Sequence, residues 1–142
     1  MSSYTDDEFI RACEDEIEVL NVIFPGDVTD LRRLKYDENG TYIAPKLTII
    51  LRPQESRLTD AKTDYYEAKL WIELSKAYPF KIPDKLIVEA SSKVMSNQMR
   101  AQLQSSLIKL AERKADEGEV YLYDLCDLTK ARIMKLFDRN IL

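Results

Sequence analysis

Residues 65–74, YYEAKLWIEL, carry the most regular hydrophobic pattern in the chain. Apolar side chains alternate with charged or aromatic ones, which is the period of a β-strand with one buried face. The set predicted to face inward is Tyr66, Ala68, Leu70, Ile72 and Leu74. Burial on one side only is typical of antiparallel sheets, so this stretch predicts an antiparallel sheet covered by helices on one side.

Three further strands are predicted around this one. Residues 42–52 also alternate, with Leu47, Ile49 and Leu51 on one face. Asn39-Gly40 can supply the positive backbone angles of a tight turn, which predicts a hairpin between residues 31–36 and 42–52. The polar residues 53–64 are predicted to form a loop. A short fourth strand over residues 86–90 follows a proline-containing connection.

Helices are predicted on both sides of this run of strands. The sequence TDDE at residues 5–8 is a capping box, and apolar residues then recur every three or four positions until Pro25-Gly26. After the sheet, an apolar stripe from Met99 to Ala111 predicts a second helix ending near Gly118. A third helix is predicted from Leu122 to the C-terminus. The order predicts an α+β two-layer sandwich of one helix, a four-stranded antiparallel sheet and two helices.

Length and charge narrow the class of protein. A chain of 142 residues is the usual size of one domain, and we expect residues 1–142 to form a single domain. The net charge of -4 argues against general binding to nucleic acid or to an anionic membrane. The sequence shows no apolar run of roughly 18–20 residues, which a membrane span needs, and its acidic start lacks the core of a secretory signal. We therefore expect a cytoplasmic domain.

Because the chain ends inside a predicted helix, we expect an excised domain from the N-terminus of a longer protein.

The residues that usually carry chemistry are scarce. The chain has no histidine, which excludes serine–histidine and cysteine–histidine nucleophiles and most zinc sites. Its two cysteines, Cys13 and Cys126, are too few for a disulfide framework. The carboxylates are not spaced for acid–base chemistry or for a metal. The sequence predicts no catalytic residue, no cofactor and no metal site.

Three stretches together resemble the RWD domain family, whose fold is that of ubiquitin-conjugating enzymes without the catalytic cysteine. They are EDEIEVLNVIF with GDVTDL at residues 14–31, YPFKIP at 78–83 (the YPxxxP signature) and GEVYLYDL at 118–125. The match covers nearly the whole chain and implies a non-catalytic protein-interaction domain. Ubiquitin-conjugating enzymes carry their cysteine downstream of this signature, but residues 84–125 contain none. Cys126 lies on the apolar stripe of a predicted helix, where a thiol is inert.

Within the family, the chain most resembles the N-terminal domain of kinases that phosphorylate the alpha subunit of translation initiation factor two during amino-acid starvation. The resemblance implies a general amino-acid control and stress-response role in translation regulation. It implies that the domain docks its kinase onto a large ribosome-associated scaffold that activates the kinase. The alternative is an RWD module of a ubiquitin- or SUMO-pathway protein that assists a ligase.

Four residues are predicted to have structural roles. Pro79 and Pro83 restrict the backbone and so predict a rigid run of turns after the third strand. This run begins at Tyr78. Glu16 lies at the margin of the apolar stripe of the first helix, where an unpaired carboxylate would be costly. We predict that Glu16 ties this helix to the turns. The donor is either the Tyr78 hydroxyl or a backbone N–H of the turns.

Two surface features are candidates for partner binding. The first is an acidic cluster around the junction of the last two helices. The family resemblance implies that the partner-binding surface lies on these helices. The alternative is that the cluster is an ordinary solvated surface, as charge runs commonly are. The second is Trp71, which either caps the outer sheet face beside Tyr65 or is an exposed aromatic anchor. The acidic candidates are Glu112, Asp116, Glu117, Glu119, Asp124 and Asp127.

Overall fold

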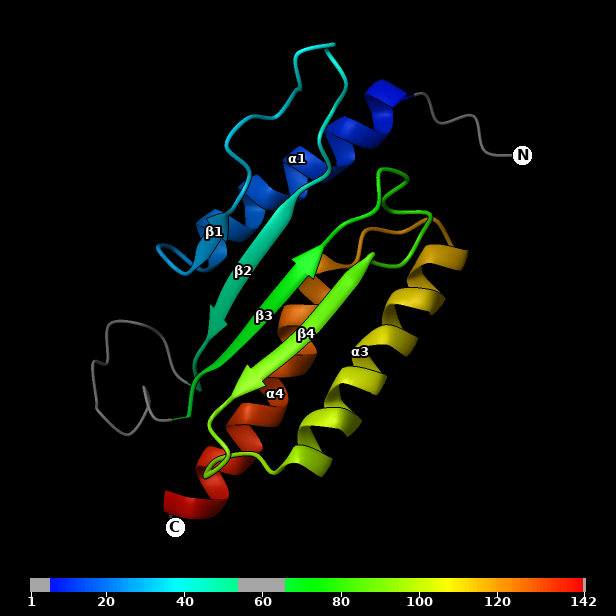
Figure 1. The fold of residues 1–142 in the computed structure, drawn as a ribbon. Helices are drawn as coiled ribbons and strands as arrows, with labels where there is room; N and C mark the ends of the chain where they lie inside the picture. The colour runs from blue at the N-terminus through cyan, green and yellow to red at the C-terminus, as the bar shows by residue number, and fades with distance from the viewer. Residues whose placement is uncertain (1–5, 54–65, 142) are drawn as a thin grey trace.

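A computed structural model describes residues 6–53 and 66–141 (Figure 1). Its elements follow the predicted order of one helix, four strands and two helices. They are α1 (Asp6–Ile23), β1 (Val28–Asp30), β2 (Lys46–Leu51), β3 (Ala68–Glu73), β4 (Lys85–Ala90), α3 (Asn97–Asp116) and α4 (Leu122–Ile141). The predicted α+β class is confirmed.

The four strands form one antiparallel sheet in the order β1-β2-β3-β4. Leu70 at the centre of β3 lies opposite Ile49 of β2 and Val88 of β4. Figure 1 shows α4 behind the sheet, with α1 and α3 on either side of it. The helices therefore cover one face, and the other face is open toward the viewer.

The alternation read from the sequence matches the buried face of the sheet. Leu47, Ile49 and Leu51 of β2 are each at most 1% exposed, and so are Ala68, Leu70 and Ile72 of β3. They pack against the helices through Leu20, Leu103, Leu107 and Leu125, all at most 1% exposed. Burying each such leucine or isoleucine contributes about 1.5–3 kcal/mol. The hydrophobic pattern of the strands is thus what holds the two layers together.

The predicted hairpin before β2 is wrong in its first strand. Residues 31–36 form no strand, and β1 instead covers Val28–Asp30, with Val28 opposite Ile49. A turn does form at Asn39-Gly40, but it closes only the single bridge between Tyr36 and Tyr42, and only Gly40 has a positive φ. The reason is that residues 31–36, LRRLKY, offer no period-two apolar face.

Arg32 holds this connection against α1 by polar contacts. Its guanidinium donates to Glu14 at 3.0 Å, to Asp30 at 2.7 Å and to the carbonyl of Ile43 at 2.8 Å, with only 1% of the side chain exposed. Burial opposes ionisation of Glu14, but hydrogen bonds from Lys35, Tyr42 and Arg32 outweigh it and lower the pKa of Glu14. No sequence pattern predicted this network, because its members are spread over 29 positions, from Glu14 to Tyr42.

The ends of α3 follow local sequence rules. The Ser96 hydroxyl accepts from the N–H of Met99 at 3.1 Å, which makes Ser96 the N-cap. At the other end, Gly118 takes a φ of 69° and donates to the carbonyl of Ala115. The predicted stop at Gly118 is confirmed. Met99, expected on the apolar stripe, is 36% exposed.

Two further predictions lie outside the described residues. They are Thr5 of the capping box and the loop at 53–64, of which only the first residue is described.

Candidate protein-binding surface

The three sequence stretches that carry the family resemblance meet at the hydroxyl of Tyr78, which is fully buried. That oxygen accepts from the N–H of Tyr121 at 2.7 Å and from the N–H of Leu122 at 3.2 Å. A hydroxyl has two acceptor sites and one proton, and both backbone groups can only donate. The Tyr78 proton is therefore directed to the carboxylate of Glu16, which it contacts.

Glu16 completes this arrangement from α1. It is 8% exposed, and its second oxygen accepts from the N–H of Tyr123 at 3.2 Å. Of the two donors left open by the sequence, the structure uses the Tyr78 hydroxyl. The backbone donor comes from the start of α4 and not from the turns. We call Glu16, Tyr78 and the N–H groups of residues 121–123 the Glu16–Tyr78 clasp.

The turns that present Tyr78 are themselves buried. Pro79 and Pro83 are both buried, and the Tyr78–Pro79 peptide bond is cis. Tyr121 packs its ring edge-on against Tyr78 at a centroid distance of 4.7 Å and donates its hydroxyl to the carbonyl of Lys81 at 2.7 Å. The connection from α3 to α4 is thus bonded to the turns on both sides of Pro79, at Tyr78 and at Lys81, which fixes the direction of α4.

Burial of Glu16 makes the clasp sensitive to pH. Burial raises the pKa of Glu16 from 4.5 to about 7, against the opposing effect of the Tyr123 N–H. An acid whose pKa is raised by folding holds its proton more tightly in the folded state. Its contribution to stability is full below pH 4.5 and is lost as the pH rises toward 7.

We therefore expect the Glu16 contribution to the free energy of unfolding to fall by about 2–3 kcal/mol between pH 5 and pH 8. Urea unfolding of the wild type and of Glu16→Gln at several pH values measures it, because glutamine does not titrate. The difference between the two proteins should change across this range. A difference that stays constant would show that Glu16 titrates at its ordinary pKa.

The acidic candidates lie around the connection that the clasp fixes. Glu112 and Asp116 lie on α3, Glu117 caps its C-terminus, Glu119 follows Gly118, and Asp124 and Asp127 lie on the first turns of α4. Lys114 stands among them, with its amine 2.9 Å from Glu119 and 3.8 Å from Asp124. Part of the negative charge is therefore compensated within the domain.

A groove of about 610 Å³ runs between α3 and α4 and contains two of the six acidic residues, Asp124 and Asp127. Three cationic side chains, Lys109, Arg113 and Lys114, line the same groove. Its apolar part is formed by Leu110, Leu128 and Ala131. We call it the α3–α4 groove. Glu112 lines a different groove, on the side of α3 next to β4. The structure thus separates Glu112 from Asp124 and Asp127, and the surface combines both charges with an apolar floor.

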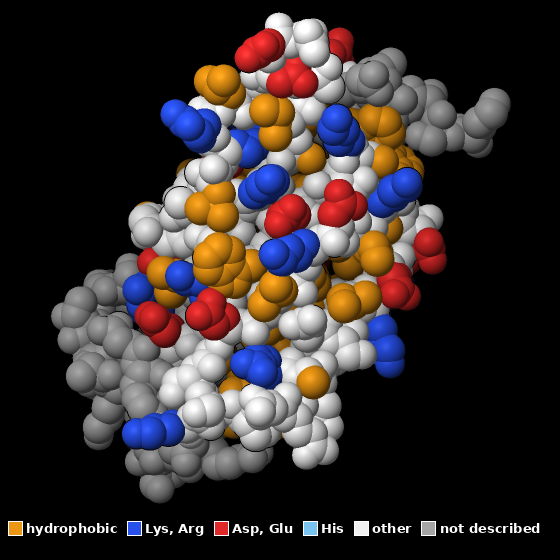
Figure 2. All heavy atoms as spheres, viewed as in Figure 1, with side chains coloured by type: hydrophobic (Ala, Val, Ile, Leu, Met, Phe, Trp, Pro, Cys, Tyr) orange, Lys and Arg blue, Asp and Glu red, His pale blue; other side chains and the backbone are white. Residues whose placement is uncertain are grey.

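Trp71 lies on the open face of the sheet and is half-buried. Its indole N–H donates to Glu89 at 2.6 Å, and the amine of Lys69 lies 5.1 Å from the ring centroid. Thr48 and Ile87 flank it on the neighbouring strands. Figure 2 shows this face, on which hydrophobic side chains mix with cationic and acidic ones. Tyr65, the expected neighbour, lies outside the described residues.

Neither cysteine is in a position to act as a nucleophile. Cys13 is 3% exposed and Cys126 is fully buried. Burial raises the pKa of Cys13 to about 12 and raises that of Cys126 further still. Across residues 6–53 and 66–141, no three acidic, cysteine or histidine side chains group as metal ligands would. In the same residues no helix has the length and apolar character of a membrane span.

An antiparallel sheet with helices on one face and a proline turn after its third strand are features of a ubiquitin-conjugating-enzyme-like fold. The model of the RWD domain family matches residues 11–133, and the chain belongs to this family. RWD domains are non-catalytic protein-interaction modules that lack the active cysteine of ubiquitin-conjugating enzymes.

Among solved structures, the chain is similar to the solution structure of the RWD domain of mouse GCN2. The two have a TM-score of 0.71 and 24% sequence identity, over 95% of this chain and 88% of the mouse chain. This likeness shows the fold. No curated protein matches the chain.

Proposed function

We propose that this RWD domain docks a starvation-responsive kinase of translation initiation factor two alpha onto its ribosome-associated scaffold activator, in the cytoplasm. The parent protein would be a serine/threonine protein kinase with this domain at its N-terminus. The observation that carries the proposal is the α3–α4 groove with the acidic residues at its end, held in place by the Glu16–Tyr78 clasp. The similarity to the RWD domain of mouse GCN2 supports it.

The exposed acidic residues at the connection between α3 and α4 suit a partner with a basic patch. Glu117 and Glu119 are exposed, and Asp124 keeps 38% of its side chain exposed beside Lys114. Such partly screened surface charges act mainly on the rate of association and make binding sensitive to salt. The apolar floor of Leu110, Leu128 and Ala131 offers the partner area to bury.

Reversing the charge at Glu117, Glu119 and Asp124 together is expected to weaken scaffold binding about tenfold or more, mainly by slowing association. Surface plasmon resonance with the purified scaffold at two salt concentrations measures both rates. Wild-type binding should weaken as salt rises, and binding of the triple variant should depend less on salt.

A control variant carries the same charge change elsewhere. Asp15 and Glu18 on α1 and Glu38 in the connection before β2 are exposed. Reversing these three should leave the affinity nearly unchanged, and circular dichroism should show both variants folded. Equal affinity of the two triple variants would remove the acidic surface from the docking site. Capture of a ubiquitin or SUMO ligase and not of the scaffold would favour the alternative role.

A further inference from the structure

The outer edge of β4 presents backbone groups that the sheet does not use. The N–H of Val88 donates to the side-chain oxygen of Gln104 on α3, at 3.2 Å, so it points away from β3. In an antiparallel pair the outward and inward groups alternate along the strand. Leu86 and Ala90, two positions away on either side, therefore also direct their N–H and C=O groups outward.

Within residues 6–53 and 66–141, Gln104 is the only protein group that bonds to these outward-facing groups of β4. The side chains of Leu86 and Val88 point inward and are 7% and 2% exposed. The edge of β4 is thus a row of backbone donors and acceptors on a strand whose inward side chains belong to the core. Such an edge is a template for a further strand.

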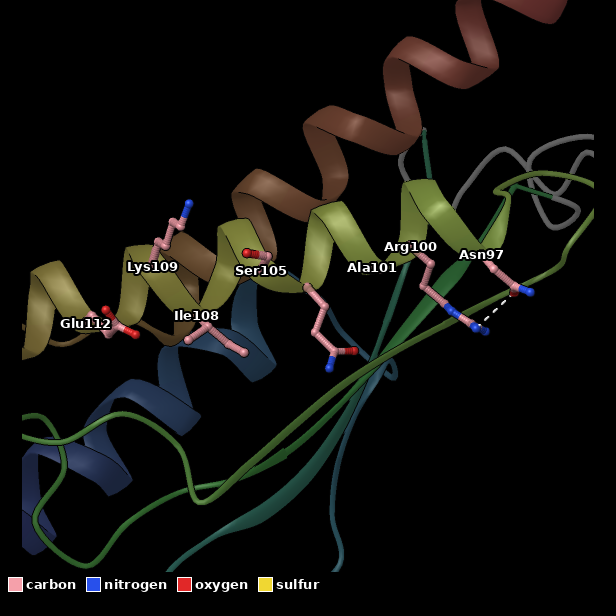
Figure 3. Close-up of a pocket in the computed structure, with 8 residues that line it drawn as sticks. Asn97, Arg100, Ala101, Ser105, Ile108, Lys109 and Glu112 are labelled. Atoms are coloured by element: carbon pink, nitrogen blue, oxygen red, sulfur yellow. Dashed lines mark hydrogen bonds between the residues drawn. The ribbon is translucent and has the colours of Figure 1, made fainter.

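A groove of about 490 Å³ lies beside this edge, on the surface of α3. We call it the β4 groove. Its lining includes Ala101, Gln104 and Ile108, with Arg100 toward one end and Lys109 and Glu112 toward the other. Figure 3 shows Asn97, Arg100 and Ile108 on the side of α3 that faces the strands. A side chain from an added strand would enter this groove over Ala101 and Ile108.

The charges of the β4 groove favour an acidic ligand. Arg100 bonds to Asn97 at 3.0 Å, and neither Arg100 nor Lys109 forms an ion pair among the described residues. Glu112 supplies the one negative charge of the lining, against two positive ones. Pairing of two β4 edges from two copies would bring the Arg100 end of each groove to the Lys109 and Glu112 end of the other. The two charges at that end offset each other, so a second copy offers Arg100 less than the acidic side chain of a peptide does.

We propose that the β4 edge binds an extended peptide segment of a partner protein as a fifth strand. The peptide places an apolar side chain over Ala101 and Ile108 and an acidic side chain beside Arg100. Its backbone bonds to Leu86, Val88 and Ala90, and Gln104 yields its bond to Val88 when the peptide enters. Main-chain hydrogen bonds supply affinity in this mode of recognition, and alternate side chains supply specificity. This site shares only Lys109 with the α3–α4 groove and does not depend on the function proposed for that groove.

The test uses a random peptide library displayed on phage, selected on the whole domain. The expected peptides alternate apolar and polar residues and carry an acidic residue at one end. A synthetic copy of a selected peptide should slow amide hydrogen exchange at Leu86 and Ala90. Ala101→Arg should weaken its binding at least tenfold, because arginine fills the β4 groove and adds a positive charge over the apolar contact.

Gln102→Arg is the matched control. Gln102 is exposed on α3 and lines neither groove, so this variant adds the same side chain to the same helix. It should bind the peptide as the wild type does. Equal binding by both variants would overturn the proposal, and so would a selection that yields no such peptide. A concentration-dependent dimer that Ala101→Arg abolishes would assign the edge to a second copy instead.

Discussion

Replacing Tyr78 by phenylalanine is expected to lower the free energy of unfolding by about 2–4 kcal/mol, the range for leaving buried donors and a carboxylate without a partner. The lost hydroxyl serves the N–H groups of Tyr121 and Leu122 and the carboxylate of Glu16. Among the described residues, no other side chain is bonded to the N–H of Tyr121, and only the Glu16 carboxylate also interacts with the N–H of Leu122. The ring itself is kept, so packing against Tyr121 is preserved and the change reports on the hydrogen bonds.

Urea unfolding of Tyr78→Phe, Glu16→Ala and the double variant measures the coupling inside the clasp. Glu16→Ala alone should cost about 1–3 kcal/mol. Because each variant breaks the same bond, the double variant should cost less than the sum, with a coupling of about 0.5–3 kcal/mol. Strictly additive losses would show that the hydroxyl does not serve the carboxylate.

Tyr123→Phe is the control for this series. Tyr123 lies next to the clasp but contributes only its backbone N–H, and its side chain is 41% exposed. Removing its hydroxyl should change the free energy of unfolding by less than about 0.5 kcal/mol, as at other surface positions. A loss as large as that of Tyr78→Phe would mean that tyrosine hydroxyls matter here irrespective of the clasp.

The second large effect is expected at Gly118, between α3 and α4. Its φ of 69° is a conformation that side-chain-bearing residues rarely adopt. A Cβ at this position would also lie 2.6 Å from Cε1 of Phe80, inside contact distance. Phe80 cannot move freely, because its ring packs edge-on against Phe9 at 5.7 Å. We expect Gly118→Ala to destabilise the fold by about 2–4 kcal/mol, backbone strain and overpacking together.

Gly40→Ala separates the two contributions. Gly40 has a φ of 76°, close to that of Gly118, but a Cβ there meets nothing within 4 Å. Its expected cost is about 1 kcal/mol, from backbone strain alone. Thermal unfolding of both variants, in the wild type and in a Phe80→Ala background, measures the difference. The excess at Gly118 should shrink once the ring is absent. Equal losses of stability in Gly118→Ala and Gly40→Ala would show that the Phe80 ring moves aside without an energetic cost.

Strand faces and helix ends could be predicted from the sequence because they depend on near neighbours in the chain. Leu70 and Ile72 lie two residues apart and must share a face of a strand. Gly118, the predicted stop of α3, acts on backbone groups within a few residues of itself. The element order, the inner face of the sheet and the stop of α3 followed from such local rules, as did the placement of Glu16 at the edge of an apolar stripe.

The first strand could not be predicted in the same way. Its residues are half-buried or exposed, so they carry no apolar alternation, and their position is set by pairing with Leu47 and Ile49 of β2. The Arg32 network that holds the following connection joins residues of α1, β1 and the loop before β2. A buried cation of this kind is visible in a sequence only as one more charged residue.

The sequence by itself determined the class of fold, the absence of histidine and the residues from which a clasp and a binding surface could be built. The tertiary structure alone decided how they combine. It brings Glu16 and Tyr123, 107 positions apart, within hydrogen-bonding distance, and it places Lys114 among the acidic residues while turning Glu112 toward the β4 groove. The physical reason is that propensity and periodicity act over a few residues. Hydrogen bonds, ion pairs and grooves between elements depend on distances that exist only once the two layers have packed.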